Sequence, residues 1–415
     1  MNRLDARGCA VSGASAEALD AWERALAATL AWRRGAEAHL DQALQAAPRF
    51  VMAHVLQAWQ LLGGRDLRRV RAARPVLDAG SAMPANERER MHLAAIAAVV
   101  RDDYDGAKCV LGELLRRHPR DVLALQVAHG LDYITGDLAR MKDRVASVRP
   151  AWSSGLPGFH AVLSMQAFSL EECGDYAQAR EVACAAMAAC GADARAHHVM
   201  AHVFEMTGQA DAGMRWMNEH ILCWGTDSVV VTHVWWHLAL FHLALGRVDR
   251  ALELYDRRVR AGRSVEIADL IDAASLLWRL HLQGADVASR AQELAAAWSP
   301  HVDDAFCSFS DLHAMLAFVA AGDWARAGQL EGLLAAAQAK PTRHGESTRL
   351  VGLAACRALI AFGQGDDSRA ALLLAGLPEF AHRIGGSHAQ RDVLALTLAR
   401  AIEREHRSGR VAQVV

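Results

Sequence analysis

The sequence contains little lysine, tyrosine and proline, and the shortage of lysine removes one class of chemistry. Only Lys108, Lys142 and Lys340 occur among 415 residues, while arginine supplies nearly all the positive charge. Covalent catalysis through a lysine Schiff base is therefore poorly provided for. The formal net charge of −2 at pH 7 offers no basic field for a phosphate backbone or an acidic membrane surface. We therefore expect no nucleic acid and no membrane among the partners.

Long apolar segments and cofactor motifs are also missing. The longest apolar runs, such as residues 93–100, are too short to span a bilayer, and the first residues lack the apolar core of a signal peptide. We expect a cytoplasmic protein. No GxxxxGK[ST] loop and no strand followed by GxGxxG occurs, which disfavours nucleotide and flavin binding. We predict no cofactor, with a divalent metal ion as the one alternative.

The eight cysteines form no CxxC pair and no disulfide-scaffold pattern, so reduced and small apolar side chains are expected. Cys173, Cys184, Cys190 and Cys223 lie in the same part of the chain as most of the histidines, which leaves a Cys/His nucleophile open. Packing is the simpler interpretation for Cys184 and Cys190, because both fall on or next to a predicted outer helix.

The sequence is rich in alanine, leucine and arginine, the residues that lose least entropy on entering a helix. A turn signal, Gly-Asp-Tyr-x-x-Ala at 174–179, recurs in weaker form along the chain. The recurrences begin at Asp102, Gly136, Gly208, Gly246, Gly284, Gly322 and Gly365. Successive spacings, including Gly174, are 34, 38, 34, 38, 38, 38 and 43 residues. A period in this range, with helical apolar spacing around each turn, predicts stacked helical hairpins.

The predicted fold is all-α, a tetratricopeptide-like α-solenoid of stacked helical hairpins that forms a right-handed superhelix. In each pair, glycine ends the first helix and the following alanine lets the second helix pack closely. Residues 36–48 and 52–62 are predicted as a second helix with a proline stop and the next first helix. We predict a flexible N-terminus over 1–17, one continuous solenoid over 18–405 and a C-terminal tail over 406–415.

Polar and aromatic side chains gather on the predicted first helices, which line the concave surface of such a solenoid. His198 and His202 are four residues apart, as are His233 and His237, so each pair stands on one helical face. Further members on these helices are His160, His197, Glu205, Trp236, His242, Asp269, Asp272, Trp278, His281, Asp311 and His313. A single such histidine is more often a hydrogen-bonded core residue, but a cluster would need a buried partner for each imidazole. The cluster therefore favours a functional pocket.

Several of these residues belong to longer motifs. The motifs are His198-x-x-x-His202-x-x-Glu205, His233-x-x-Trp236-His237, Asp272 with Trp278-Arg279-Leu280, Asp311-x-His313, and Gly385-Gly386-Ser387-x-Ala389-Gln390-Arg391-Asp392. With them the chain resembles the tetratricopeptide repeat protein 38 family over most of its length, and ordinary tetratricopeptide repeats lack these histidines. The resemblance implies a shared set of inner-face residues at His160, His198, His202, Glu205, His233, Trp236, His237, Asp272, His313, Gln390 and Arg391.

Bacterial members of that family are also encoded beside biosynthetic enzymes, including those for azapteridine antibiotics of the toxoflavin kind. The resemblance therefore implies an enzyme that acts on a flat, nitrogen-rich heterocycle, for which tryptophan stacking and histidine hydrogen bonds are suitable.

The main functional prediction is a biosynthetic enzyme, of the oxidoreductase or lyase type, with a small polar or heterocyclic metabolite bound in the concave face. Imidazoles near carboxylates can perform acid/base chemistry, and cofactor-independent oxidation is the other reaction considered. The catalytic candidates are His198, His202, Glu205, His233, His237, Asp272 and His313. The substrate-binding candidates are His160, Trp236, Asp311, Gln390 and Arg391.

Other functions remain open. The two HxxxH pairs suit zinc or another divalent ion, with His198, His202, His233 and His237 as ligands, although neither pair contains the glutamate of HExxH. A tetratricopeptide array can instead be a scaffold for a peptide or protein partner, and a homodimer is a further alternative. The inner helices offer His, Trp, Asp and Ala rather than the Lys, Arg and Asn common in peptide grooves, which favours a closed pocket.

The glycine pair before Ser387 allows two interpretations. Gly385 and Gly386 can present backbone N–H groups to an anion, with charge added by Arg391. Ser387 can equally be the N-cap of the next helix after a tight turn.

Overall fold

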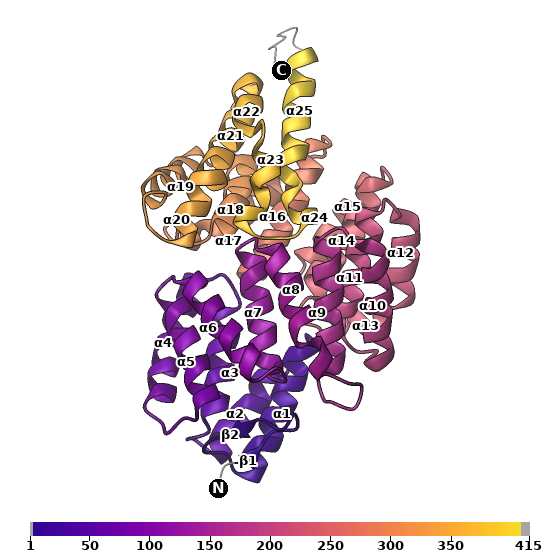
Figure 1. Ribbon diagram of the computed structural model, residues 1–415. Coiled ribbons are helices and arrows are strands. Elements are labelled where there is room, and N and C mark those ends of the chain that lie inside the picture. Colours follow the sequence, from indigo (N-terminus) through magenta and orange to yellow (C-terminus); the bar gives the residue numbers. More distant parts are fainter. Residues whose placement is uncertain (1–2, 408–415) are drawn as a thin grey trace. The chain divides into compact units, whose positions relative to one another are not determined.

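The computed structural model describes residues 3–407, and most of that range is helical (Figure 1). The chain divides into two compact units, whereas the sequence predicted one continuous solenoid over 18–405. The first unit contains residues up to Tyr133 and Asp137–Val234, and the second contains Ile134–Gly136 and the residues from Trp235 onward. Within the described range, no helix combines the length and the apolar character needed to cross a membrane.

The first unit contains a short β-hairpin followed by paired helices. Its elements are β1 (Arg3–Leu4), β2 (Ala10–Val11), α1 (Ala16–Leu30), α2 (Ala36–Ala46), α3 (Val51–Leu62), α4 (Leu67–Ser81), α5 (Glu87–Val100), α6 (Tyr104–Arg117), α7 (Val122–Ile134), α8 (Leu138–Val148), η1 (Arg149–Ala151), α9 (Phe159–Glu172), α10 (Tyr176–Ala189), α11 (Ala194–Met206), α12 (Ala210–Glu219) and α13 (Ile221–Trp224). The unit boundary falls inside α14 (Val231–Ala244), which is one continuous helix.

The second unit continues the paired helices and includes two π-helical segments, η2 and η4. After α14 its elements are α15 (Val248–Leu254), η2 (Tyr255–Val259), α16 (Ile267–Leu282), α17 (Ala288–Trp298), η3 (Ser299–His301), α18 (Ser308–Ala321), α19 (Trp324–Ala337), α20 (Arg343–Ser347), η4 (Thr348–Gly352), α21 (Leu353–Gly363), α22 (Asp367–Leu374), α23 (Leu377–Phe380), η5 (Ala381–Ile384), α24 (His388–Arg391) and α25 (Val393–Arg407).

The turn signals of the sequence are left-handed turns between the helices of each pair. Positive φ angles of 64–86° occur at Asp102, Gly136, Gly174, Gly208, Gly246, Gly284, Gly322 and Gly365. At one such turn the backbone N–H groups of Gly174 and Asp175 donate to the last carbonyls of α9, because glycine tolerates this conformation without strain. The alanines after the turns are buried, with exposures of 0% at Ala179 and 1% at Ala327. The predicted all-α, tetratricopeptide-like fold is confirmed.

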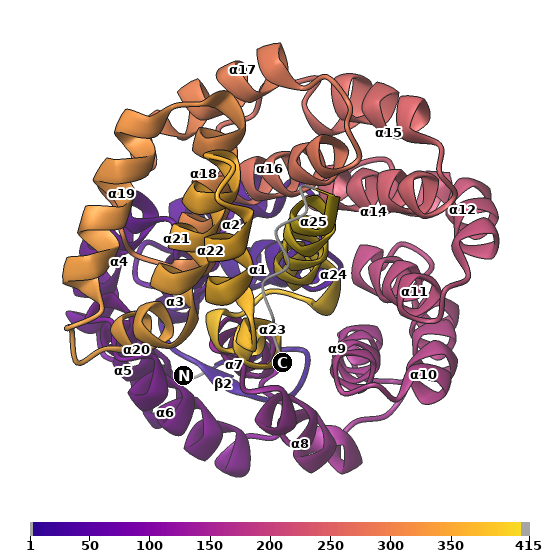
Figure 2. The ribbon, with the colours of Figure 1, turned by 90° about the horizontal axis from the view of Figure 1, so that it is seen from above.

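The helices of each pair form two layers. In the first unit α9 packs against α10 and α11, with α9 and α11 side by side and α10 in the other layer (Figure 2). Leu163, Ala186 and Ala196 meet where these three helices touch, and each is at most 6% exposed. Small side chains at this contact let the helices approach closely. The layering gives α11 a face that is turned away from α10 and α12.

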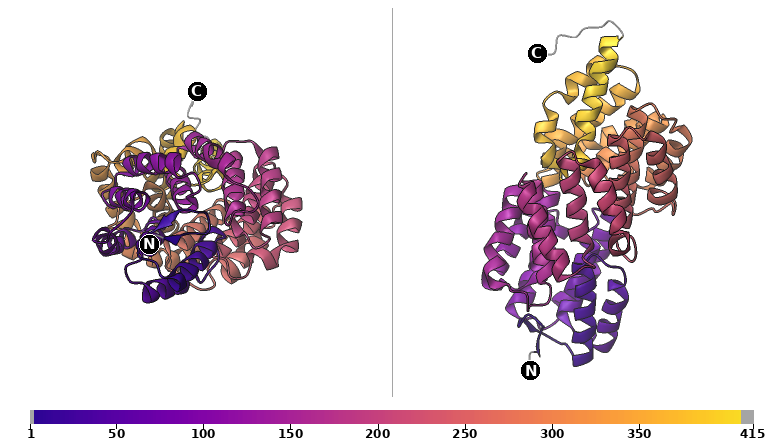
Figure 3. Two further views of the ribbon diagram at one scale, coloured as in Figure 1. Left: turned by 60° about the horizontal axis from the view of Figure 1, so that its bottom comes forward. Right: turned by 90° about the vertical axis from the view of Figure 1, so that its right-hand side faces the viewer.

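The predicted flexible N-terminus needs correction for the residues that the structure describes. β1 and β2 pair antiparallel beside the first helices (Figure 3). The guanidinium of Arg7 is buried and donates to both carboxylate oxygens of Glu23 on α1, at 2.7 and 2.9 Å. Asp5 accepts from the backbone N–H groups of Arg7 and Cys9. These bonds hold the hairpin on α1, a long-range effect that the local sequence does not reveal.

The predicted C-terminal tail over 406–415 begins inside a helix. α25 continues to Arg407, so the first two residues of that range are helical. Residues 408–415 lie outside the described part of the chain.

Candidate functional site

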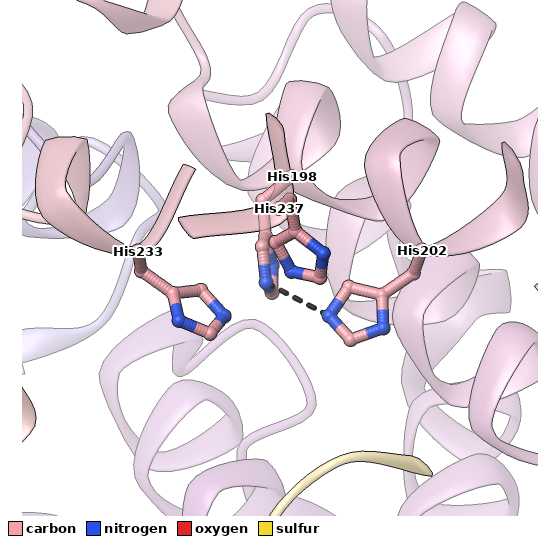
Figure 4. A group of neighbouring side chains, drawn as sticks. All are labelled: His198, His202, His233 and His237. Atoms are coloured by element: carbon pink, nitrogen blue, oxygen red, sulfur yellow. Dashed lines mark hydrogen bonds between the residues drawn. The ribbon is translucent and has the colours of Figure 1, made fainter. Parts of the chain in front are cut away.

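Four histidines from α11 and α14 come together (Figure 4). His198 and His202 stand one turn apart on α11, and His233 and His237 stand one turn apart on α14. One ring nitrogen from each histidine lies within 4.8 Å of one from every other. His233 and His237 belong to the same helix, so helical geometry places them one turn apart. We call these residues the four-histidine group, which matches the pairing predicted from the two HxxxH motifs.

Two imidazoles of this group are in direct contact. The Nε2 atoms of His198 and His202 are 2.9 Å apart, the distance of a hydrogen bond in which one ring donates and the other accepts. The ring of His233 lies 4.8 Å from that of His198, centre to centre. His198, His202 and His237 are buried, whereas His233 is partly exposed. The group is therefore a buried imidazole cluster with one accessible member.

Two glutamates that the sequence did not nominate lie behind His202. An Oε2 atom of Glu171 is 3.7 Å from Nδ1 of His202, and Glu172 belongs to the same compact set of possible ligand atoms. Both glutamates end α9 and are at most 2% exposed. Glu205, the predicted carboxylate, lies at the partly exposed end of α11 and is not in that set.

A sequence signal for Glu171 and Glu172 existed. Two consecutive acids at the C-terminal end of a helix are disfavoured by the helix dipole, so their occurrence there suggests another purpose. A carboxylate behind an imidazole fixes which ring nitrogen carries the proton. At 3.7 Å the Glu171 carboxylate is beyond hydrogen-bond distance of Nδ1, so it acts on the His202 ring through its charge, and Nε2 of His202 faces His198.

Aromatic rings enclose His198. Phe168 of α9 stacks on it with ring centres 5.8 Å apart and also meets the edge of His202 at 5.6 Å. Trp32, from the loop between α1 and α2, lies 5.7 Å from the His198 ring. No motif in the sequence links Trp32 to the histidines, since more than 160 residues separate them. The contact exists only because the loop between α1 and α2 folds onto the start of α11.

His160 and His197, two further histidines of the first helices, have structural partners. Nδ1 of His160 is 2.8 Å from the carboxylate of Asp193, which is the N-cap of α11. Nε2 of His197 is 3.0 Å from the carbonyl oxygen of Gly191. The predicted substrate-binding residue His160 thus contacts the helix cap and is not a member of the four-histidine group.

The remaining predicted residues belong to the second unit. Trp236 is fully buried, with its ring against His237 at 4.8 Å and the Arg279 guanidinium 5.4 Å from its centre. Asp272 is 2% exposed on α16. Nδ1 of His313 is 2.7 Å from the carbonyl oxygen of Phe309, one turn earlier on α18. These contacts define well-packed positions in that unit.

The glycine pair near the C-terminus is used for capping. Ser387 caps α24 in a reciprocal box with Gln390, in which the side chain of each accepts from the backbone N–H of the other. Arg391 donates to the carbonyl oxygen of Gly386. The N-cap interpretation is therefore correct for Ser387. Gln390 and Arg391, predicted to bind substrate, use part of their side chains in these local bonds, and their role in substrate binding stays a prediction.

A second buried polar cluster surrounds Asp311. Its Oδ2 atom is 3.9 Å from Nε2 of His344, and Oγ of Ser308 is 2.9 Å from Oγ1 of Thr348. Burial, with a smaller effect from Asp304, raises the pKa of Asp311 well above its usual value. Burial lowers the pKa of His344 to about 4. His344 is therefore neutral at neutral pH, and burial disfavours the charged form of Asp311. Of the two residues, the sequence pattern identified only Asp311.

The cysteines give no sign of an activated thiol. All eight are free, in agreement with the expected reduced state. Burial is the main cause that raises the pKa of Cys173, so its thiolate is disfavoured.

The helical pairs and their left-handed turns define a helical repeat protein of the tetratricopeptide type. No family model matches the chain. Among solved structures, the crystal structure of the P58(IPK) tetratricopeptide domain is similar over 95% of this chain and 99% of that chain. The sequence identity is 14% and the TM-score is 0.24. The fold assignment rests on the helices and turns of the chain itself, and the resemblance to the tetratricopeptide repeat protein 38 family stays a prediction.

Proposed function

We propose that the four-histidine group is the centre of an enzyme that transfers protons to or from a small polar metabolite. The observation that carries this proposal is the 2.9 Å contact between the Nε2 atoms of His198 and His202. A proton shared between two imidazoles can move with little rearrangement, and imidazoles titrate near physiological pH in the absence of other influences.

The surroundings of this contact supply the two ends of a proton path. At the inner end, the carboxylate of Glu171 faces Nδ1 of His202 at 3.7 Å and offsets a positive charge on the buried ring. At the outer end, His233 lies beside His198 and is partly exposed. A substrate that reaches His233 therefore meets a chain of rings that ends on a buried carboxylate.

The aromatic side chains support a flat substrate. Trp32 lies beside His198 and is partly exposed, and an indole can bind a planar polar molecule by stacking, while Phe168 holds the His198 ring from its own helix. A heterocyclic metabolite of a biosynthetic pathway, as the family resemblance implies, would suit these rings.

A divalent metal ion at the same four histidines is the second candidate. Two nitrogens bound at 2.0–2.1 Å to one ion lie about 2.9 Å apart at a right angle and about 3.4 Å apart at a tetrahedral angle. The Nε2 atoms of His198 and His202 are already at 2.9 Å, and the other two rings are within reach. Glu171 behind His202 has the position of a carboxylate that orients a metal-bound imidazole.

The fold itself favours a third candidate. Stacked helical pairs provide extended surfaces that bind peptides or proteins, and this scaffold function needs no reaction at the histidines.

One set of measurements separates the three candidates. The purified full-length protein is analysed for metal content and by native mass spectrometry, then incubated with a fractionated metabolite extract before and after exhaustive chelation. Turnover that survives chelation and disappears in His202→Gln, with His39→Gln as a surface control, supports proton transfer. Chelator-sensitive turnover restored by zinc, iron or manganese supports the metal candidate and contradicts ours. Absence of any turnover, with a specific peptide partner recovered, supports the scaffold.

A further inference from the structure

Arg195 is a buried cation whose donors are largely unused. It lies on α11, three residues before His198 and on the same side of the helix, and is 3% exposed. Its Nη2 donates to the side-chain oxygen of Gln126 at 2.8 Å. Within the described residues, Nε and Nη1 have no hydrogen-bond partner, and these two atoms carry three of the five N–H groups of a guanidinium.

Among the residues that the structure describes, no carboxylate forms an ion pair or a hydrogen bond with this guanidinium. Burial lowers the pKa of Arg195 to about 10, and the charge of Asp193 offsets only part of that effect. The carboxylate of Asp193 accepts from the backbone N–H groups of Arg195 and Ala196 and is also bonded to His160 and Ser164. It makes no hydrogen bond to the guanidinium. A buried charge without an ionic partner is costly, so its retention here needs a reason.

The imidazole near Arg195 does not compensate its charge. His129 lies nearby, and burial together with the charge of Arg195 lowers the pKa of that imidazole to about 3. His129 is therefore neutral and adds no negative charge. An incoming anion would be the first full counter-charge to form hydrogen bonds with the guanidinium.

Trp32 covers both Arg195 and the four-histidine group. Its ring centre is 4.6 Å from the guanidinium carbon, and its ring is 5.7 Å from that of His198. The backbone of Trp32 has φ 56°, a left-handed conformation that a bulky residue rarely adopts. Backbone bonds hold the loop in place, from Val229 to the carbonyl of Trp32 and from Ala194 to the carbonyl of Ala31. Strain of this kind is commonly kept at functional sites.

We propose that Arg195 binds a carboxylate group of the small-molecule ligand, next to the four-histidine group, and that Trp32 is the movable cover of this anion site. A planar carboxylate can accept from two N–H groups on one edge of a guanidinium, and here Nε or Nη1 would pair with the second N–H of Nη2, whose first N–H is bonded to Gln126. Nε and Nη1 are shielded from solvent, so the carboxylate enters as the partly exposed indole of Trp32 moves aside. This inference rests on the proposed function in one respect: the molecule whose carboxylate binds Arg195 is taken to be the substrate of the four-histidine group.

The test measures anion binding directly. Full-length protein is titrated with oxalate, pyruvate and inorganic phosphate at constant ionic strength in chloride, by calorimetry and tryptophan fluorescence. We expect saturable carboxylate binding with a fluorescence change that Trp32→Phe removes. Arg195→Met should weaken binding by at least about tenfold, and Arg195→Lys, which keeps the charge but loses the fork, should restore it only in part.

Arg180→Met is the matched control, because that guanidinium also lies over a ring, 4.9 Å from the centre of Phe204 on the same unit. The Arg180→Met variant should bind carboxylates with the affinity of the wild type. If Arg195→Met does not fold, the comparison of Arg195→Lys with wild type decides, and unchanged affinity there overturns the proposal. Absence of saturable binding, or tighter binding of phosphate than of any carboxylate, also overturns it.

Failure of the anion site at Arg195 can be distinguished from failure of the proposed enzyme activity. His202→Gln should keep the carboxylate affinity while losing turnover. Turnover that depends on His202 without any Arg195-dependent anion binding contradicts only the anion site. Anion binding through Arg195 in a protein without turnover contradicts only the enzyme.

Discussion

Both units bury a histidine near a carboxyl group, and the two sites differ in what surrounds the pair. In the first unit Glu171 faces His202, whose other nitrogen meets His198, and the rings continue to the partly exposed His233. In the second unit Asp311 faces His344 across 3.9 Å, and burial raises the pKa of Asp311 and lowers that of His344. The two clusters therefore differ in their surroundings, although each places a buried imidazole near a carboxyl group.

The two clusters differ in the groups that contact the imidazole and in their exposure to solvent. The second cluster is completed by hydroxyl groups, since Ser308 and Thr348 bond to each other and approach His344. The first cluster contains several convergent ring nitrogens and one that reaches the surface. We expect the first cluster to carry function and the second to set the pH dependence of folding.

The largest expected effect is on metabolite turnover, which should depend on the first cluster and not on the second. His202→Gln should reduce metabolite turnover by a factor of about 100 or more, because it removes one of the two imidazoles that share the proton. His344→Gln should leave turnover nearly unchanged. Free energies of unfolding are measured alongside for both variants. A destabilisation of His202→Gln as large as that of a core Leu→Ala change, roughly 2–5 kcal/mol, would identify His202 as a structural residue.

The second prediction concerns stability at acidic pH. The pKa of His344 is lowered to about 4 in the folded protein, while the unfolded chain has the usual value of about 6.5. The unfolded state then binds more protons between these values, so stability is lost as the pH falls from about 6.5 to 4. The loss attributable to this residue is roughly 3 kcal/mol at most. Chemical denaturation of wild type and His344→Gln at pH 7.5 and 4.5 measures it; equal losses would contradict the assignment.

The third prediction has the opposite sign. Because the pKa of Asp311 is raised in the folded protein, its contribution is fully present below the unfolded value of about 3.9 and is lost as the pH rises toward the folded value. Asp311→Asn should therefore gain stability relative to wild type as the pH increases from 4 to 8. The difference between the two melting curves isolates this group from His344. A constant difference across that range would mean that Asp311 is ionised.

The smallest expected effect tests the capping residue of the second unit. Ser387→Ala should lower the free energy of unfolding by about 1 kcal/mol, since it removes the N-cap of α24. Ser387→Asp should retain most of the stability. Binding of phosphate or oxalate that Ser387→Ala weakens would instead revive the anion interpretation of the glycine pair.

Much of the fold could be predicted because its instructions are local. A turn at Gly174 needs a residue that tolerates positive φ, and the regular recurrence of such residues fixes the helical pairs. The grouping of His198 with His202 follows from helical periodicity in the same way, as does that of His233 with His237. The N-terminal hairpin could not be predicted, because it depends on Arg7 reaching Glu23 on another element.

The sequence by itself determined the helices, the turns and the four imidazoles, since each depends on residues within a few positions of one another. Only the tertiary structure decided which carboxylate stands behind His202, that Arg195 bonds to Gln126, and that Trp32 lies against both Arg195 and His198. Glu171 is on another helix and Trp32 is in a distant loop, so their contacts arise from packing between elements. Such contacts depend on the three-dimensional course of the chain, which periodicity along one helix does not encode.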